Sequence, residues 1–189
     1  MIETLRLTLK PLTYDQLLLY IRCDHSLEFE LGLNPSMRTM TPELVDAIEQ
    51  TILPHVADPA KNYLFNTLWT AIDSDAQQMV GDLCFVGEPN EAGEIEIGYG
   101  TYPEFQGRGY MTEMVSGMIA WAKTQPGVRA IIASTDATNL ASYRVLQKNH
   151  FVKTGEDGGM LQWRLAWCVY AAAVASVPAK TLMELGWPL

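Results

Sequence analysis

The chain has 189 residues, is 48% hydrophobic and carries a net charge of -9, which is enough apolar material for one globular domain with a full hydrophobic core. The acidic balance argues against a nucleic-acid partner, because no basic patch is present to neutralise phosphates. It suits cationic partners such as amines, and equally a charge that keeps a cytosolic protein soluble.

The cysteines and the ends of the chain indicate a cytoplasmic protein. Cys23, Cys84 and Cys168 are far apart and form no CxxC pair, so neither a disulfide framework nor a metal site is predicted. The N-terminus carries early charge and no long apolar region, so no signal peptide is expected. The longest apolar run, 166–178, is too short and too rich in alanine to span a bilayer, so no membrane partner is expected.

A strand and a helix are predicted at the start of the chain. Leucines alternate with polar residues over 5–10, which is typical of a half-buried strand, and Pro11 closes it. Thr13, followed three residues later by Gln16, is a capping-box pattern ahead of an apolar run. A helix is therefore expected from near Tyr14.

A second helix is predicted to begin at Thr41-Pro42, which supplies an N-cap and a proline at the first helical position. Apolar residues at 44, 48 and 52 share one face of this helix, and Pro54 is expected to end it. The stretch 24–40 before it is predicted to be irregular. Strands over 63–72, 79–87 and 94–102, joined by polar turns, then predict an antiparallel meander.

Helices and strands alternate in the second half of the chain. A helix over 110–123 has apolar residues at three-four spacing, and a strand over 128–134 is continuously apolar, as if buried on both faces. An amphipathic helix over 139–149 and a closing hairpin over 151–165, with its turn at Gly158-Gly159, complete the pattern. No repeat or linker interrupts it, so one domain is expected.

The most informative segment is Gln106-Gly107-Arg108-Gly109-Tyr110-Met111-Thr112-Glu113, which lies between a predicted strand and a predicted helix. A glycine turn that opens a helix presents free backbone N–H groups at the positive end of the helix dipole, an arrangement that binds phosphate. The segment is not a Walker A loop, because no Gly-Lys-Ser/Thr ends it, and it is not a dinucleotide fingerprint, because the preceding strand ends a meander. A phosphate-containing cofactor is therefore expected here.

In this context the sequence resembles the GNAT superfamily of acyl-CoA-dependent N-acetyltransferases, and within it the ribosomal-protein N-terminal (Rim-type) branch. The family's pyrophosphate loop reads Gln/Arg-x-x-Gly-x-Gly/Ala, and Gln106, Gly109 and Met111 occupy its defined positions. A second pattern, Asn-x-x-Ser-x-x-Val-Leu-x-Lys-x-Gly-Phe, is matched over 139–151. The opening residues 2–12 and the tetrapeptide Glu96-Ile97-Gly98-Tyr99 also resemble this branch, and the likeness extends to about Leu165.

Two residues depart from the family patterns. Met111 replaces glycine or alanine, so the first turn of the helix is bulkier; the methionine either shifts the cofactor or fills a gap. His150 replaces the glycine before Phe151, so it must accept or avoid a left-handed conformation. We interpret His150 as structural rather than catalytic.

The resemblance implies an α+β fold, a three-layer α/β arrangement with a GNAT-like mixed, mostly antiparallel central sheet and flanking helices. It implies an acyl-CoA N-acyltransferase domain over 1–166. The apolar content of the C-terminal extension over 167–189 predicts that the extension packs on the domain or on a partner chain, which leaves a homodimer open. It further implies acetyl-CoA as cosubstrate without a metal, and an amine acceptor that is a protein N-terminus or a small molecule. The alternatives are an acyl-CoA-binding regulatory module without catalysis and a different nucleotide-phosphate binder.

The resemblance also implies which residues hold the cofactor. The pantetheine arm would pair with the strand end Gly100, Thr101 and Tyr102, and the thiol end would meet Asn139 and Ser142. Asn139 could equally serve only as the N-cap of its helix. The pyrophosphate would lie on the loop, where Arg108 either adds a charge or points to solvent; the loop residues are Gln106, Gly107, Arg108, Gly109, Tyr110, Met111 and Thr112.

Acetyl transfer by direct attack of an amine requires a base, an oxyanion donor and an acid for the leaving thiolate. Glu96 is the predicted base, directly or through water, and Glu94 on the same strand face is its rival; both could instead be solvated carboxylates. Ser142 or Tyr143 is predicted to protonate the thiolate, although Tyr143 could be a packed aromatic. In this family the region between the first helices shapes the acceptor site, so acidic residues within 24–40 either suit a cationic amine or lie in solvent.

Overall fold

The protein, described by a computed structural model over residues 1–167, is built on one eight-stranded sheet with the order β1-β2-β3-β4-β5-β6-β8-β7. Within the described sheet β5 and β6 run parallel, and the other neighbouring strands run antiparallel. The predicted mixed, mostly antiparallel sheet is therefore confirmed. The strands are β1 (Ile2–Glu3), β2 (Leu7–Pro11), β3 (Leu68–Asp73), β4 (Gln78–Phe85), β5 (Glu94–Thr101), β6 (Ala130–Asp136), β7 (Val152–Asp157) and β8 (Met160–Ala166).

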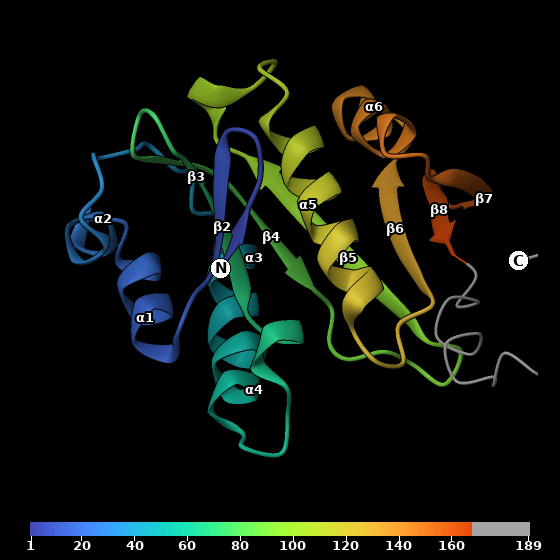
Figure 1. Cartoon of the computed structure of the whole chain (residues 1–189), viewed down its shortest axis with the longest axis horizontal. Coiled ribbons are helices and arrows are strands. Elements are labelled where there is room, and N and C mark those ends of the chain that lie inside the picture. The colour runs from blue at the N-terminus through green and yellow to red at the C-terminus, as the bar shows by residue number, and fades with distance from the viewer. Residues whose placement is uncertain (168–189) are drawn as a thin grey trace, which may run out of the picture.

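Helices cover both faces of this sheet (Figure 1). They are α1 (Tyr14–Arg22), α2 (Ser26–Leu31), α3 (Pro42–Ala47), α4 (Leu53–Ala57), α5 (Tyr110–Thr124) and α6 (Leu140–Lys148). A π-helical turn, Ile48–Ile52, joins α3 to α4, and short 3₁₀ turns are formed by Tyr63–Phe65 and Pro103–Phe105. No helix among residues 1–167 is both long and apolar enough to cross a membrane.

Aromatic packing shows which helices lie on which face. Trp121 of α5 packs on Trp69 and Phe85, with ring centroids 5.4 and 5.5 Å apart, on one face of β3 and β4. Asp82 of β4 points to the opposite face, because side chains alternate along a strand, and there it meets Tyr20 of α1. The two faces of the sheet are therefore buried by different helices, which is the predicted three-layer arrangement.

The N-terminal prediction is right for the helix and wrong for one leucine. The Thr13 hydroxyl accepts from the Gln16 N–H and the Gln16 side chain accepts from the Thr13 N–H, which is the expected capping box of α1. Leu7 and Leu9 are fully buried, but Leu5 is 92% exposed. Leu5 lies in the turn between β1 and β2, so the alternation of leucines runs past the end of the strand.

The helix that Pro54 was predicted to end continues to Ala57 instead. A proline in a helix lacks a backbone donor and crowds the preceding turn. Here that turn is π-helical: the Leu53 N–H bonds to the Ile48 carbonyl five residues back, so the chain widens and passes the proline without breaking.

Three further expectations are corrected. The stretch 24–40 is not wholly irregular, because it contains α2. β3 begins at Leu68 rather than Tyr63, because Asn62 caps a 3₁₀ turn ahead of it. β6 is buried on both faces only at its start, since Ser134 is exposed. The predicted extension beyond Trp167 and the third cysteine lie outside the described residues.

Candidate cofactor and active site

A wedge opens in the sheet between β5 and β6. The parallel register covers only residues 94–96 of β5 and 130–132 of β6, whereas β5 continues to Thr101 and β6 pairs with β8 along its whole length. On its other edge β5 stays bonded to β4, through the Tyr102 N–H and the Glu96 carbonyl among others. Because hydrogen bonding alternates along an antiparallel strand, the backbone groups of Tyr99 and Thr101 point away from β4 and into the wedge.

A group of backbone N–H groups that are unbonded within residues 1–167 lies beside this wedge, at the start of α5. Gly107 and Gly109 have φ angles of 76° and 81°, in the left-handed region that glycine adopts without strain. The first helical bond of α5 runs from the Glu113 N–H to the Gly109 carbonyl, and within the described chain the N–H groups of residues 109–112 make no hydrogen bond. Free N–H groups at a helix N-terminus bind phosphate without a metal.

The wedge and the loop line one cleft of about 580 Å³, a size suited to a cofactor. Two of the predicted cofactor residues lie off its wall: Arg108 is exposed, with its guanidinium 5.5 Å from the Phe105 ring, and Tyr102 is buried beside Asp82. The predicted cofactor residues that do line the cleft are Gly100, Thr101, Gln106, Gly107, Gly109, Tyr110, Met111, Thr112, Asn139 and Ser142.

Neither departure from the family pattern obstructs the cleft. Met111 is only 6% exposed, and its methyl group lies over Gly81 of β4, where a Cβ would come within 3.1 Å of it. The methionine therefore fills a gap in the core that the glycine opposite leaves. His150 has a φ of 64°, so it adopts the left-handed conformation that a glycine would take more easily, and it is exposed outside the cleft.

Sequence reasoning passed over Tyr99 as a site residue, although the structure places it in the cleft. Its hydroxyl lies 2.9 Å from the Ser142 hydroxyl, and burial raises the pKa of Tyr99 although the Ser142 hydrogen bond opposes that shift. Tyr143, by contrast, packs edge-on against Trp163 at 4.8 Å, and its hydroxyl accepts from Gln147 outside the cleft. The sequence alone does not show which of these two tyrosines lines the cleft. The contact between β5 and α6, in which the Tyr99 hydroxyl meets the Ser142 hydroxyl, does.

Helix α6 supplies two further groups to the cleft. Asn139 caps the helix, since its side-chain oxygen accepts from the Ser142 N–H at 3.1 Å; it also lines the cleft, so the N-cap role does not exclude the predicted cofactor contact. Arg144 and Lys148, one turn apart, also line the cleft and bring positive charge to it. The four-residue spacing of these two cations on an amphipathic helix is the sequence signal that they share one face.

The predicted base and its rival lie on the face of β5 opposite Tyr99. Glu94 is engaged, because the Arg164 Nε donates to its carboxylate at 2.8 Å, and this hydrogen bond lowers the pKa of Glu94. The Glu96 side chain makes no hydrogen bond or ion pair within residues 1–167. Beside Glu96 the strand is bare: a Cβ on Gly100 would meet no atom within 4 Å, and one on Gly98 only the Cys84 sulfur at 3.8 Å.

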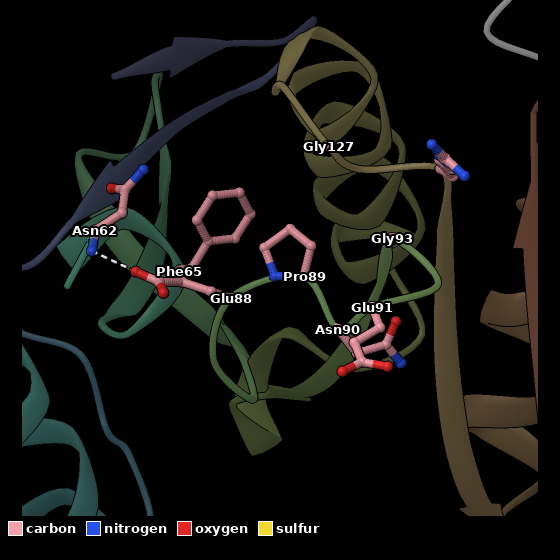
Figure 2. A pocket seen from close by; sticks show the side chains of 9 residues that line it. Asn62, Phe65, Glu88, Pro89, Asn90, Glu91, Gly93 and Gly127 are labelled. Carbon is pink, nitrogen blue, oxygen red and sulfur yellow. Dashed lines mark hydrogen bonds between the residues drawn. The ribbon is translucent and has the colours of Figure 1, made fainter.

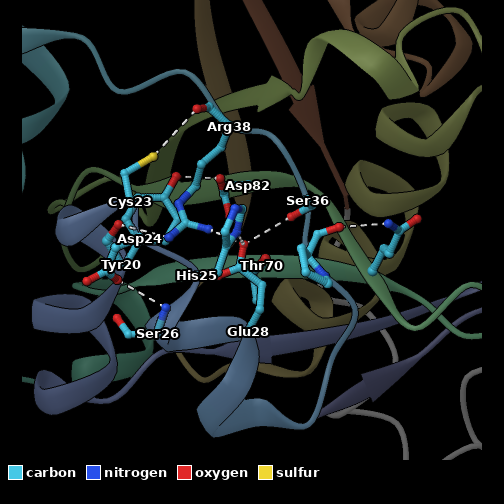
Figure 3. A network of polar contacts seen from close by, with 12 residues as sticks. Tyr20, Cys23, Asp24, His25, Ser26, Glu28, Ser36, Arg38, Thr70 and Asp82 are labelled. Carbon is cyan, nitrogen blue, oxygen red and sulfur yellow. Dashed lines mark hydrogen bonds and ion pairs between the residues drawn. The ribbon is translucent and has the colours of Figure 1, made fainter.

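A buried polar network borders this face of the sheet (Figure 3). Glu28 and Arg38, each 1% exposed, form an ion pair at 2.7 Å; burial opposes the ionised Glu28, but hydrogen bonds and Arg38 hold its pKa below the usual range. Arg38 also donates to the Tyr20 carbonyl, and the Tyr20 hydroxyl donates to Asp82 at 2.7 Å. Glu28 is thus neither in solvent nor free for an acceptor, contrary to expectation.

A second hollow, of about 490 Å³, lies at the opposite end of β5, by the turn between β4 and β5 (Figure 2). Phe65, Pro89 and Arg129 are among its lining residues, and Glu88 there accepts a hydrogen bond from the Asn62 N–H. Its lining includes no serine, cysteine or histidine and no residue predicted to bind the cofactor, so we assign it no chemistry.

Comparisons with known proteins agree with this geometry. Residues 6–152 match the family model described as an acetyltransferase (GNAT) domain. An uncharacterized N-acetyltransferase of Bacillus subtilis, YjdG, is 32% identical over 95 residues, which are 50% of this chain and 56% of that protein. The chain thus spans little more than half the length of this curated relative.

Solved structures share the fold at low sequence identity. RimL, a ribosomal L7/L12 alpha-N-protein acetyltransferase in complex with coenzyme A, superposes with a TM-score of 0.61 at 18% identity, over 86% of this chain and 95% of that one. A spermidine N-acetyltransferase from Vibrio cholerae, in complex with CoA and spermine, gives 0.59 at 13% identity, over 85% and 95%. With a family model that covers most of its length and a sheet that splays beside a glycine loop, the chain belongs to the GNAT acetyltransferase family.

Proposed function

We propose that this protein is an acetyl-CoA-dependent N-acetyltransferase, which transfers an acetyl group to a primary amine by direct attack in a ternary complex. The observation that carries the proposal is that a strand edge not paired by β6, at Tyr99 and Thr101, meets the free N–H groups of residues 109–112 in one cleft; within the described chain the Thr101 carbonyl on this edge accepts only a 3.4 Å bond from the Gln106 side chain. Coenzyme A has the matching chemistry, because a row of amides in its pantetheine arm leads to a pyrophosphate. RimL and the spermidine acetyltransferase, both solved with CoA, support this assignment.

Each part of the cleft then has a task. The edge of β5 pairs with the pantetheine amides as an added strand would, and the start of α5 binds the pyrophosphate. Arg144 and Lys148 contribute positive charge for the remaining phosphate. When bound, acetyl-CoA would supply an activated thioester for the attacking amine.

The acceptor amine approaches from the other face of the sheet, across the bare backbone of Gly98 and Gly100. Open space above Gly100 leaves room for an amine there. Glu96 takes the proton from the attacking amine, directly or through a water molecule. We favour Glu96 over Glu94, because Arg164 holds the Glu94 carboxylate and makes it a weaker base.

The leaving thiolate receives its proton from the Tyr99–Ser142 pair. As the N–C bond forms and the C–S bond breaks, one proton leaves the amine for Glu96 and another passes to sulfur from the paired hydroxyls. Ser142 lines the cleft and lies in hydrogen-bonding contact with Tyr99, whereas the Tyr143 hydroxyl is committed elsewhere. This geometry favours Ser142 over Tyr143 among the two predicted acids.

The acceptor is either a protein N-terminal amine or a small amine, the two classes on which RimL and the spermidine enzyme act. Thiol release from acetyl-CoA, measured over a panel of polyamines, small amines and N-terminal peptides, tests the proposal; mass spectrometry of the products locates the acetyl group. Release that depends on one acceptor class, above the background without acceptor, is expected. CoA binding without transfer to any amine would instead establish the alternative, a non-catalytic acyl-CoA-binding module.

A further inference from the structure

Arg6, in the turn between β1 and β2, reaches across the sheet to the glycine loop. One of its terminal nitrogens donates to the Arg108 carbonyl at 3.2 Å, and the other would lie 3.7 Å from a Cβ placed on Gly109. Arg6 is not among the residues that line the cleft, so it contacts the loop from behind. The segment is one of those that resemble the family's opening strand, yet nothing in the transfer chemistry uses it.

Several contacts hold the Arg6 guanidinium in this position. Its Nε donates to Glu113 at 2.7 Å and its backbone N–H donates to the same carboxylate at 2.6 Å. The Thr4 hydroxyl adds a third bond to Glu113 at 2.7 Å. The guanidinium also lies 4.6 Å from the centre of the Tyr110 ring, whose hydroxyl donates to Asp73. These contacts hold the Arg6 guanidinium on two sides, so its position beside the loop is fixed.

The bond to the Arg108 carbonyl has a geometric consequence for the next amide. In a trans peptide the C=O of one residue and the N–H of the next point in opposite directions, and the described chain contains no cis bond. Holding the Arg108 carbonyl against Arg6 therefore turns the Gly109 N–H the other way, into the cleft that Gly109 lines. A carbonyl facing the cleft would instead repel a pyrophosphate.

Charge supports the same role. Glu113 lies in the first turn of α5, close to where an anion would bind; burial opposes its ionisation, but hydrogen bonds from Thr4 and Arg6 lower its pKa. An unpaired carboxylate at this point would weaken the attraction of the helix N-terminus for phosphate. Arg6 neutralises it at 2.7 Å.

We infer that Arg6 is a positioning residue for the cofactor: it locks the Arg108–Gly109 peptide with its N–H facing the pyrophosphate and cancels the charge of Glu113. This inference rests on the proposed function, because it names the group that prepares the same site. It makes the N-terminal hairpin part of the cofactor-binding machinery although the hairpin does not touch the cofactor.

Calorimetric titration with CoA tests the inference on Arg6→Gln and Arg6→Lys. Arg6→Gln is expected to weaken CoA binding about 10- to 100-fold, the range for losing a charged hydrogen bond. Arg6→Lys keeps the charge but cannot bridge Glu113 and the Arg108 carbonyl with a planar fork, so a loss of at least several-fold is expected. S-acetylpantetheine, which lacks the pyrophosphate, should be used as donor equally well by wild type and Arg6→Gln.

Arg164→Gln is a matched control. The Arg164 side chain is 43% exposed and the Arg6 side chain 41%, and each pairs through Nε with a glutamate, at 2.8 Å and 2.7 Å respectively. Arg164→Gln should bind CoA as wild type does. If Arg6→Gln does not fold, Arg6→Lys, which keeps a cation beside Glu113, carries the test, and its CoA binding should still be several-fold weaker than that of wild type. Unchanged CoA affinity in Arg6→Gln, or full affinity in Arg6→Lys, would overturn the positioning role. A wild-type protein that binds no CoA would overturn the proposed function itself.

Discussion

Asp82 is expected to make the protein less stable as the pH rises from about 4 to 6, and Asp82→Asn should remove this dependence. The carboxyl is buried on β4, where the Tyr20 hydroxyl donates to Oδ2 at 2.7 Å; Oδ1 has no hydrogen-bond partner within the described chain. Burial raises the pKa of Asp82 from 3.8 to about 6, against the opposing effects of the Tyr20 hydrogen bond and the Arg38 charge.

The direction and size of the effect follow from this shift. Between pH 4 and 6 the folded protein holds the Asp82 proton while the unfolded chain releases it, so the free energy of unfolding falls as the pH rises. The favourable contribution is complete below the unfolded pKa and lost above the folded one. A shift from 3.8 to about 6 corresponds to about 3 kcal/mol.

Other carboxyls act in the opposite direction, so the wild-type curve alone does not isolate Asp82. Hydrogen bonds and Arg6 or Arg38 overcome burial to lower the pKa of Glu113 and Glu28, and the stability from these groups is lost on acidification. The difference between Asp82→Asn and wild type cancels them. Relative to wild type, the variant should gain about 3 kcal/mol between pH 3 and pH 7.

Urea unfolding followed by tryptophan fluorescence measures this difference, since Trp69 and Trp121 lie in the core with ring centroids 5.4 Å apart. Parallel stability curves for wild type and Asp82→Asn would refute the reasoning. Tyr20→Phe provides a second check. It removes a hydrogen bond that lowers the pKa of Asp82, so the pH-dependent loss of stability should move to higher pH.

Two further predictions concern the active face of β5 and its neighbour β4. Glu96→Gln should lower kcat about 100- to 10,000-fold in the thiol-release assay, with little change in CoA affinity. Because Arg164 already engages the Glu94 carboxylate, Glu94→Gln should keep a kcat within a few-fold of wild type. Equal activity of Glu96→Gln and wild type would exclude Glu96 as the base. Gly81→Ala should destabilise the fold by about 1–3 kcal/mol in urea, because its Cβ would lie 2.6 Å from the Gly100 carbonyl oxygen and 3.1 Å from the Met111 methyl group. Gly98→Ala, whose Cβ would make an ordinary 3.8 Å contact with the Cys84 sulfur, should change stability by less than about 1 kcal/mol, and similar values for both variants would contradict the packing argument.

Sequence reasoning succeeded where the signal is local. The capping box at Thr13 and the glycine turn before α5 involve residues within a few positions of one another, so their local geometry can be recognised in the sequence, while phosphate binding by the turn stays a prediction. Pro54 shows the limit of local rules, because a π-helical turn, with the Leu53 N–H bonded to the Ile48 carbonyl, lets the helix continue past the proline. Leu5 shows another, since alternating residues do not reveal where a strand becomes a turn.

The parts of the site that were missed depend on contacts between distant segments. Arg6 and Glu113 are 107 positions apart, and Tyr99 and Ser142 are 43 apart, so no periodicity or motif pairs them. The choice of Tyr99 rather than Tyr143 is made by the packing of α6 on β5. Nothing in the sequence indicates that Glu28 is buried, because its ion-pair partner, Arg38, lies ten residues further along an irregular stretch and no motif pairs the two.

Met111 illustrates how a departure from a motif can be neutral. The family pattern has a small residue there, and a methionine pointing outward from the helix start would crowd a bound phosphate. In the structure its methyl group lies over Gly81, directly across from Thr101 in the β4–β5 register, and the side chain is turned into the core. The small residue expected at the helix start is thus found on the strand beneath it, so volume is conserved between helix and sheet.

The same register connects the two faces of the site. Asp82 stands opposite Gly100, so the buried carboxyl and the open floor of the proposed acceptor face lie on adjacent strands, while the next residue of β5, Tyr99, lines the cleft on the other face. A change in the ionisation of Asp82 therefore acts on the strand whose other edge is expected to bind the pantetheine. Asp82→Asn is therefore expected to alter the pH dependence of thiol release from acetyl-CoA as well as that of unfolding, although Asp82 does not line the cleft; superimposable pH–rate profiles for the variant and wild type would contradict this coupling.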